Sequence, residues 1–176
     1  MNTVWLDKKA LGERLLSSDV MCNYIPQTQW PELIDFAWDK GKQQAAKYRG
    51  QKPSDLALEK DITIVEHDKG PRQIYSEFYA NRKRLILNKN CIEDNFIKKN
   101  RKYLPDDSYE AVRELFIAHE LFHYLECCDP AVGITFRQRK VVARRVFGKE
   151  WKVGIRALSE IGAHSFSKHL LDWPAL

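Results

Sequence analysis

The sequence lacks any long apolar run. A membrane-spanning helix needs about 18 consecutive apolar residues, and charged residues, which make up 30% of the 176 residues, interrupt every apolar stretch well before that length. Residues 1–20 also mix acidic, basic and apolar side chains, without the basic-then-apolar order of a secretory signal. These absences argue against a membrane protein or an exported one, and we expect a globular protein of the cytoplasm.

Cysteine is scarce, and its spacing fits neither a zinc finger nor a disulfide framework. The four cysteines are Cys22, Cys91, Cys127 and Cys128, of which the last two are adjacent. Zinc fingers use pairs of cysteines separated by about two to four residues, and small secreted domains use regular sets of paired cysteines. We therefore expect reduced thiols, as in a cytoplasm, that take no part in the chemistry.

Acidic residues are few between Arg137 and Arg156, where eight basic residues face only Glu150. This stretch supplies much of the formal net charge of +5. Such a cluster can attract nucleic acid or an acidic partner, but it carries no known nucleic-acid motif and no evident interleaving of aromatic residues. We therefore expect a solvated helix face and a loop here, and we do not expect nucleic acid as a partner.

The chain length suits one domain, or one domain with an appendage. A helix is predicted from Pro31, a favoured first-turn residue, to Gly50, a favoured stop. Pro53 follows shortly afterwards and breaks the chain. The sequence therefore predicts a helical, peripheral N-terminal appendage over residues 1–52 and a main domain over residues 53–176.

The main domain begins with patterns typical of strands. Short β-rich runs lie at Ile62–Glu66, Ile74–Tyr79 and Arg84–Leu87, with a turn expected over residues 68–71. We expect a meander of about three strands, whose order the sequence leaves open, followed by a helix from about Ile92 to Lys102. Together with the flanking helices, these strands indicate the α+β class.

The next predicted helix runs from about Ser108 to Glu126 and is the most informative segment. Asp107 and Glu110 have the spacing of a capping box at its start. Apolar residues cover most of its circumference, which is typical of a buried helix. Two histidines and a glutamate in the middle of a buried helix need a chemical explanation.

These polar residues, His119, Glu120 and His123, spell the pattern HExxH. Residues four apart lie one above the other on a helix, so both imidazoles can reach one metal ion. Glu120 is rotated by about 100°, which places its carboxylate beside the ion, where it can act as a general base. HExxH also occurs by accident with core histidines, but its position in the middle of an apolar helix favours a zinc site.

A catalytic zinc site needs a third protein ligand and one open position. The candidates lie on a last helix, predicted from Ala157 to Leu171, which carries Glu160, His164 and His169. Glu160 shares a small, otherwise apolar face that suits packing against the HExxH helix, and it is the preferred ligand. His164, one turn further on, is the rival ligand or a group beside the site. His169 is expected to be ordinary surface or core.

The HExxH pattern, the later segment EIGAHSF (Glu160–Phe166) and the pair Leu170–Leu171 together resemble the ImmA/IrrE-like metallopeptidases. That family joins HExxH to a downstream ExxAxxF helix, whose glutamate is the third zinc ligand. The strand that ends at Asn88 is also similar to the family's strand before its active-site helix. The resemblance covers about residues 55–171 and implies a zincin-like α+β fold and a cytoplasmic peptidase, often directed at a DNA-binding repressor. This chain departs from the family at Phe122, where many members have a small residue, at Ser167, where alanine is usual, and at Leu171–Trp173, where the ending is usually more apolar.

These patterns predict a zinc endopeptidase with a specific protein substrate. The three ligands would hold Zn²⁺ and Glu120 would act as general base. His164, Tyr124 and Tyr103 are candidates for a second oxyanion donor or for a group that supports the ligands. No helix-turn-helix is evident, so a repressor substrate would be a separate protein. The alternative is a regulatory binding module that keeps zinc for stability and has no proteolytic activity.

Overall fold

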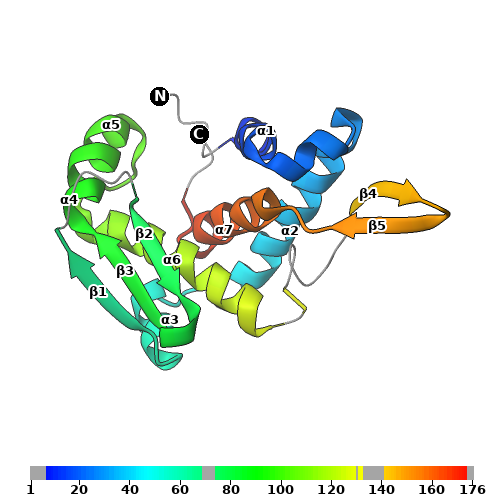
Figure 1. Cartoon of the computed structure of the whole chain (residues 1–176). Helices are drawn as coiled ribbons and strands as arrows, with labels where there is room; N and C mark the ends of the chain where they lie inside the picture. Colours follow the sequence, from blue (N-terminus) through cyan, green and yellow to red (C-terminus); the bar gives the residue numbers. More distant parts are fainter. Residues whose placement is uncertain (1–6, 69–73, 130, 133–140, 174–176) are drawn as a thin grey trace.

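Helices and strands both contribute to the structure, a computed structural model that describes residues 7–68, 74–129, 131–132 and 141–173 (Figure 1). The described part contains a three-stranded sheet, a separate two-stranded sheet and a set of helices. The α+β class expected from the sequence is confirmed. None of the helices in these segments is long and apolar enough to cross a membrane.

The three-stranded sheet consists of β1 (Thr63–His67), β2 (Ser76–Tyr79) and β3 (Arg84–Asn88), close to the predicted runs. Its order is β1-β3-β2, with β1 parallel and β2 antiparallel to β3. The predicted meander is therefore wrong. The strand β3 takes the centre because its Leu85 and Leu87 are fully buried, whereas β1 has no buried residue. The turn predicted at residues 68–71 lies mostly outside the described residues.

A helical segment follows β3 and is longer than predicted. It comprises α4 (Lys89–Cys91), the π-helical η4 (Ile92–Ile97), α5 (Lys98–Asn100) and the 3₁₀-helical η5 (Arg101–Tyr103). The helix was expected to begin at Ile92, but the side chain of Asn88 accepts a hydrogen bond of 3.3 Å from the Cys91 N–H and caps the segment earlier. Asn88 therefore both ends the strand and starts the helix.

Helix α6 (Tyr109–Cys128) carries the HExxH pattern and is largely buried, as predicted. It packs against β2 and β3 on one side and against the last helix on another. The predicted capping box of Asp107 and Glu110 is wrong, because Ser108 is the N-cap. The Ser108 hydroxyl accepts a hydrogen bond of 3.2 Å from the Ala111 N–H.

The N-terminal region is helical, as predicted, and contains α1 (Lys8–Ser18), η1 (Val20–Tyr24), η2 (Gln27–Gln29) and α2 (Trp30–Lys47), with α3 (Pro53–Glu59) after it. It is not peripheral. Helix α2 packs along α7 (Arg156–Leu170), which also packs on α6 (Figure 1). Leu11 and Ala37 share one hydrophobic core with Ile161 and Phe166. The boundary predicted after residue 52 falls between α2 and α3 and remains a prediction.

Helices α2 and α7 approach each other closely at Gly41. A Cβ atom at this position would overlap the carbonyl oxygen of Gly162, and it would lie 2.8 Å from Ser165 Cβ and 2.9 Å from the backbone nitrogen of Phe166. Only a residue without a side chain lets the two helices come this close. Across the same contact, the Ser165 hydroxyl donates a hydrogen bond of 2.6 Å to the carbonyl oxygen of Trp38.

The basic stretch forms a β-hairpin, and the expected helix face and loop are wrong for its described part. Strand β4 (Val141–Val146) pairs antiparallel with β5 (Lys149–Val153), with a register shift between Val142 and Arg144. Valine, which favours strands, occurs three times in β4, and β5 contains Trp151 and Val153, two further residues that favour strands. Phe147 and Gly148 connect the strands with positive φ angles of 49° and 75°. Residues 137–140 of the basic stretch lie outside the described residues.

Gly41→Ala should lower the free energy of unfolding by about 1–3 kcal/mol, because the added methyl group forces α2 away from α7. Chemical denaturation followed by circular dichroism measures the change. Gln43→Ala, at an exposed position of the same helix, is the control and should change stability by less than about 0.5 kcal/mol. A more stable Gly41→Ala protein would contradict the close contact, since alanine on a free helix surface is about 1 kcal/mol more favourable than glycine.

Candidate metal centre

Two imidazoles and one carboxylate converge between α6 and α7. The Nε2 atoms of His119 and His123, one turn apart on α6, lie 3.2 Å from each other. From α7, Glu160 places Oε2 3.3 Å from Nε2 of His119 and Oε1 3.6 Å from Nε2 of His123. The fold thus brings together the three residues that the sequence suggested as ligands, and this group could hold a metal ion.

The spacing of the three donors fits a small metal ion. Around a tetrahedral ion with bonds of about 2.0–2.1 Å, neighbouring donors lie about 3.3–3.4 Å apart, close to the 3.2, 3.3 and 3.6 Å found here. Imidazole and carboxylate donors suit zinc and several other transition metals. The side chains of His119, His123 and Glu160 are 16%, 21% and 42% exposed, so the donors remain accessible from solvent.

The charges around the donors also favour a cation. Burial alone would raise the pKa of Glu160, but the hydrogen bond from His119 and the charges of the two imidazoles lower this pKa to about 2. Burial alone would lower the pKa of His123, but the carboxylate of Glu126, 3.7 Å from its Nδ1, and the charges of Glu160 and Glu120 raise this pKa. Glu160 is therefore an anion at neutral pH, and further carboxylates lie close by.

A serine and a glutamate orient His123. The hydroxyl of Ser159 donates a hydrogen bond to Glu126 and lies 3.0 Å from Nδ1 of His123. Because its own hydrogen goes to Glu126, Ser159 Oγ accepts the Nδ1–H of His123, which leaves the lone pair on Nε2 to face the other donors. Such a partner fixes the orientation of a metal-binding imidazole. Sequence reasoning missed both residues, although Ser159 directly precedes Glu160.

Glu120 lies beside the converging donors and is not one of them. Its side chain is buried, with 6% exposure of the residue, and Oε1 accepts a hydrogen bond of 2.6 Å from Oγ of Ser76. Ser76 is the first residue of β2, so the sheet holds the carboxylate in place. Nothing in the local sequence marks Ser76, because its role depends on where β2 lies relative to α6.

His164 packs against the donors without joining them. Its ring meets the ring of His119 edge-on, with centroids 4.9 Å apart. Burial, and then the nearby His119, lower the pKa of His164 to about 3, so the imidazole is neutral at physiological pH. His169 belongs to the packing of α7 on α2: its Nδ1 lies 2.7 Å from the Ser165 carbonyl oxygen, and its ring meets Trp38.

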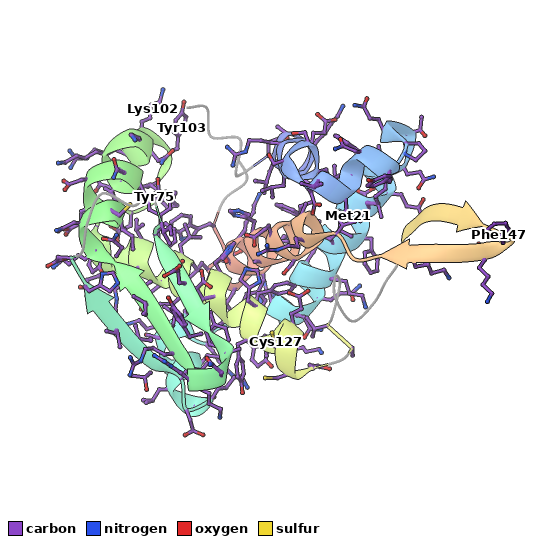
Figure 2. The ribbon with its side chains drawn as sticks, in the orientation of Figure 1. Met21, Tyr75, Lys102, Tyr103, Cys127 and Phe147 are labelled. Atoms are coloured by element: carbon purple, nitrogen blue, oxygen red, sulfur yellow. The ribbon has the colours of Figure 1, made fainter. Side chains whose placement is uncertain are left out.

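The two candidate tyrosines, Tyr124 and Tyr103, belong to α6 and η5. The ring of Tyr124 packs edge-on against Phe78 of β2 at 5.8 Å, and its hydroxyl interacts with Cys128. Tyr103 ends η5, in the helical segment after β3 (Figure 2). Cys127 lies at the C-terminal end of α6, where both cysteines are exposed and neither is part of a disulfide (Figure 2). No cysteine belongs to the converging group of donors in the described part of the chain.

The start of α7 is capped from the N-terminal region. Ile155, the residue before the helix, has no side chain that can cap it. Instead, Asp19 Oδ2 accepts a hydrogen bond of 2.9 Å from the Ala157 N–H, and its Oδ1 accepts one of 2.9 Å from the Met21 N–H. The carboxylate also meets the positive end of the helix dipole. Asp19 thereby holds the turn of α7 that carries Glu160.

Comparisons with protein-family models, with curated proteins and with solved structures found no match for this chain. No relative therefore supplies a function or a set of site residues. The chemistry of the site has to follow from its own donors, distances and charges.

Metal-free protein should bind one Zn²⁺ per chain and melt at a higher temperature once it is loaded, since an ion that binds only the folded state stabilises it. Isothermal titration calorimetry and thermal melting measure the two effects. His123→Ala and Glu160→Ala should lose both. His67→Gln, on β1, is the matched control and should bind as the wild type does. Undiminished binding by His123→Ala would contradict the site.

Ser159→Ala should weaken metal binding by about 10- to 100-fold, because His123 loses the partner that holds its ring. Competition titration with a chelator of known affinity measures the change. Ser167→Ala is the control on the same helix, since within the described segments the Ser167 hydroxyl donates its hydrogen bond to the Ala163 carbonyl oxygen and makes none to the candidate ligands. Equal metal affinity of both serine variants would show that Ser159 does not orient the ligand.

Proposed function

We propose that this protein is a zinc-dependent endopeptidase with a zincin-like fold, of the ImmA/IrrE-like kind that its motifs resemble. The observation that carries the proposal is the convergence of the two HExxH imidazoles with the carboxylate of Glu160, which comes from a different helix. His119, His123 and Glu160 are the metal ligands, and Glu120 is the general base.

The donor set supports zinc and a catalytic use of it. Two imidazoles and one carboxylate provide three protein ligands. Catalytic zinc sites have three protein ligands and one open position, whereas structural zinc sites have four protein ligands and no open position. Zinc would supply Lewis acidity, polarising the carbonyl group of a peptide bond and acidifying a water molecule. No cysteine belongs to the converging group, which further sets it apart from structural zinc sites.

Glu120 has the surroundings that a general base needs. It follows His119 directly on α6, so its carboxylate lies next to the donors, and the hydrogen bond from Ser76 restrains one of its oxygens. A restrained carboxylate beside the reacting water can accept its proton and later pass that proton to the leaving amine. His164, neutral and edge-on to His119, can hold that ligand in position without competing for the metal.

The sheet offers a surface for a peptide. Strand β2 is an edge strand, paired with β3 on one side and with no other strand among the described residues. Its first residue, Ser76, touches Glu120. An extended peptide that pairs with the outer edge of β2 would run past the proposed catalytic residues. We therefore propose an unfolded or extended segment of a protein as the substrate, and a separately encoded DNA-binding regulator is the class that the resemblance suggests.

Glu120→Gln should reduce peptide hydrolysis by about 10²- to 10⁴-fold, because the amide cannot accept the proton. Zinc affinity should remain within about twofold of the wild type, and the melting temperature should not fall. Glutamine keeps a side-chain oxygen that can accept the hydrogen bond from Ser76, and the three ligands are unchanged. The assay incubates zinc-loaded protein with an extract of the source cells and identifies new protein N-termini by mass spectrometry.

The matched control for this test is Glu110→Gln, which makes the same change on the exposed first turn of α6 and should cleave as the wild type does. N-termini that appear with both the wild type and Glu120→Gln would refute the role of Glu120. If zinc binds but no new N-termini appear with any of the proteins, the peptidase proposal fails. The alternative, a zinc-stabilised binding module, would then account for the metal site.

A further inference from the structure

The β4–β5 arm, residues 141–153, projects from the rest of the fold, which it contacts through β4 and η1. It forms its own two-stranded sheet, and neither outer edge pairs with another strand in the described part of the chain. Figure 1 shows it extending from the helices on the side away from the three-stranded sheet. A two-stranded hairpin by itself is only marginally stable in water. A hairpin that projects in this way gains little stabilisation from packing against the rest of the protein.

The tip of the arm carries a residue that the fold does not use. Phe147 is 101% exposed, so its ring contacts no other described part of the protein (Figure 2). Positive φ angles at Phe147 and Gly148, 49° and 75°, define a two-residue turn in which asparagine followed by glycine is favoured. A bulky side chain is rare and strained there. Phenylalanine therefore lowers both the stability of the turn and the solubility of the tip, which points to a contact outside this chain.

The arm is also cationic. Arg144 and Arg145 lie on β4 and Lys149 and Lys152 on β5, against a single acidic residue, Glu150. Lys152 pairs with Glu150 at 3.4 Å. Lys149, beside the tip, is exposed and has no ion-pair partner among the residues described. The excess of positive charge therefore extends along both strands up to the aromatic tip.

We propose that the β4–β5 arm binds nucleic acid, with the basic residues on the phosphates and the ring of Phe147 against the bases. Phosphates form a regular line of negative charge that suits cations spread over two strands. A two-stranded ribbon fits the major groove of DNA. One aromatic ring is enough to stack on a base or to wedge between base pairs. The proposal reverses the expectation from sequence, which was based on the lack of evident aromatic interleaving in the basic stretch and gave no weight to Phe147.

An anionic membrane is the less suitable partner. Stable attachment to a bilayer takes two signals, such as a polybasic patch with a large apolar insertion. Here the described apolar side chain at the tip is the single ring of Phe147, and Lys149 and Glu150 follow it closely, so inserting the tip would dehydrate both charges. Nucleic acid demands no such dehydration. The inference depends on the arm alone and does not rest on the proposed peptidase function.

The test measures binding of the full-length chain to fluorescently labelled 30-residue single-stranded and duplex DNA by anisotropy, from about 50 mM to about 200 mM salt. We expect binding at low salt that weakens steeply as salt rises. Phe147→Asn should weaken binding by about 5- to 150-fold, the effect of losing one stacked ring. Because asparagine suits this turn, the variant should be at least as stable as the wild type, so misfolding cannot explain the loss. Lys149→Gln should lower the slope of log affinity against log salt by about one.

Lys99→Gln removes the same charge from α5 and is the control, with affinity within about twofold of the wild type. Glu120→Gln should bind DNA as the wild type does, which keeps this proposal separate from the peptidase. No binding at low salt, or equal binding by Phe147→Asn, would overturn it. Phe147-dependent sedimentation with phosphatidylserine vesicles in the absence of DNA binding would overturn it in favour of a membrane. If the chain binds an acidic polypeptide but not DNA, the proposal is overturned in favour of a protein partner.

Discussion

The close approach of α2 and α7 at Gly41 and Gly162 determines where the candidate metal donors can meet. Helix α7 packs between α2 and α6, and the position of Glu160 relative to the histidines of α6 depends on how deeply α7 is seated. A donor displaced by a fraction of an ångström no longer matches the narrow range of metal–ligand distances. Glycine at position 41 is therefore as necessary for the candidate site as its three donors, although Gly41 itself contacts none of them.

Residues outside the HExxH pattern orient the side chains of its two histidines and its glutamate. Ser159 and Glu126 orient one imidazole, His164 packs against the other, and Ser76 restrains Glu120 from the edge of the sheet. These contacts come from three different elements, β2, α6 and α7. Each also uses a polar group that would otherwise be partly buried without a partner, which carries an energetic cost. The polar surroundings of the donors thus stabilise the fold while they arrange the candidate chemistry.

Sequence alone was informative where the relevant geometry is local. The four-residue spacing of His119 and His123 fixes their shared helix face, and α6, α7 and the positions of the three strands followed from periodicity and turn residues. What it missed depends on contacts between distant segments: the central place of β3, the bond from Ser76 to Glu120, and the packing of α2 on α7. The hairpin was missed for another reason, since its charged residues masked the valines that favour strands. The cap at Ser108 was missed because its neighbour Asp107 offered an equally plausible pattern.

The bond between Asp19 and the Ala157 N–H links two parts of the chain that are 138 residues apart in sequence. A fragment that begins at residue 53 would keep every candidate ligand and the candidate base, yet the first turn of α7 would lose its acceptor and Gly162 would lose the helix that covers it. The HExxH and Glu160 segments should therefore not keep their arrangement when they are separated from the N-terminal helices. Removal of the N-terminal helices should disturb the position of Glu160, even though every candidate donor stays in the chain.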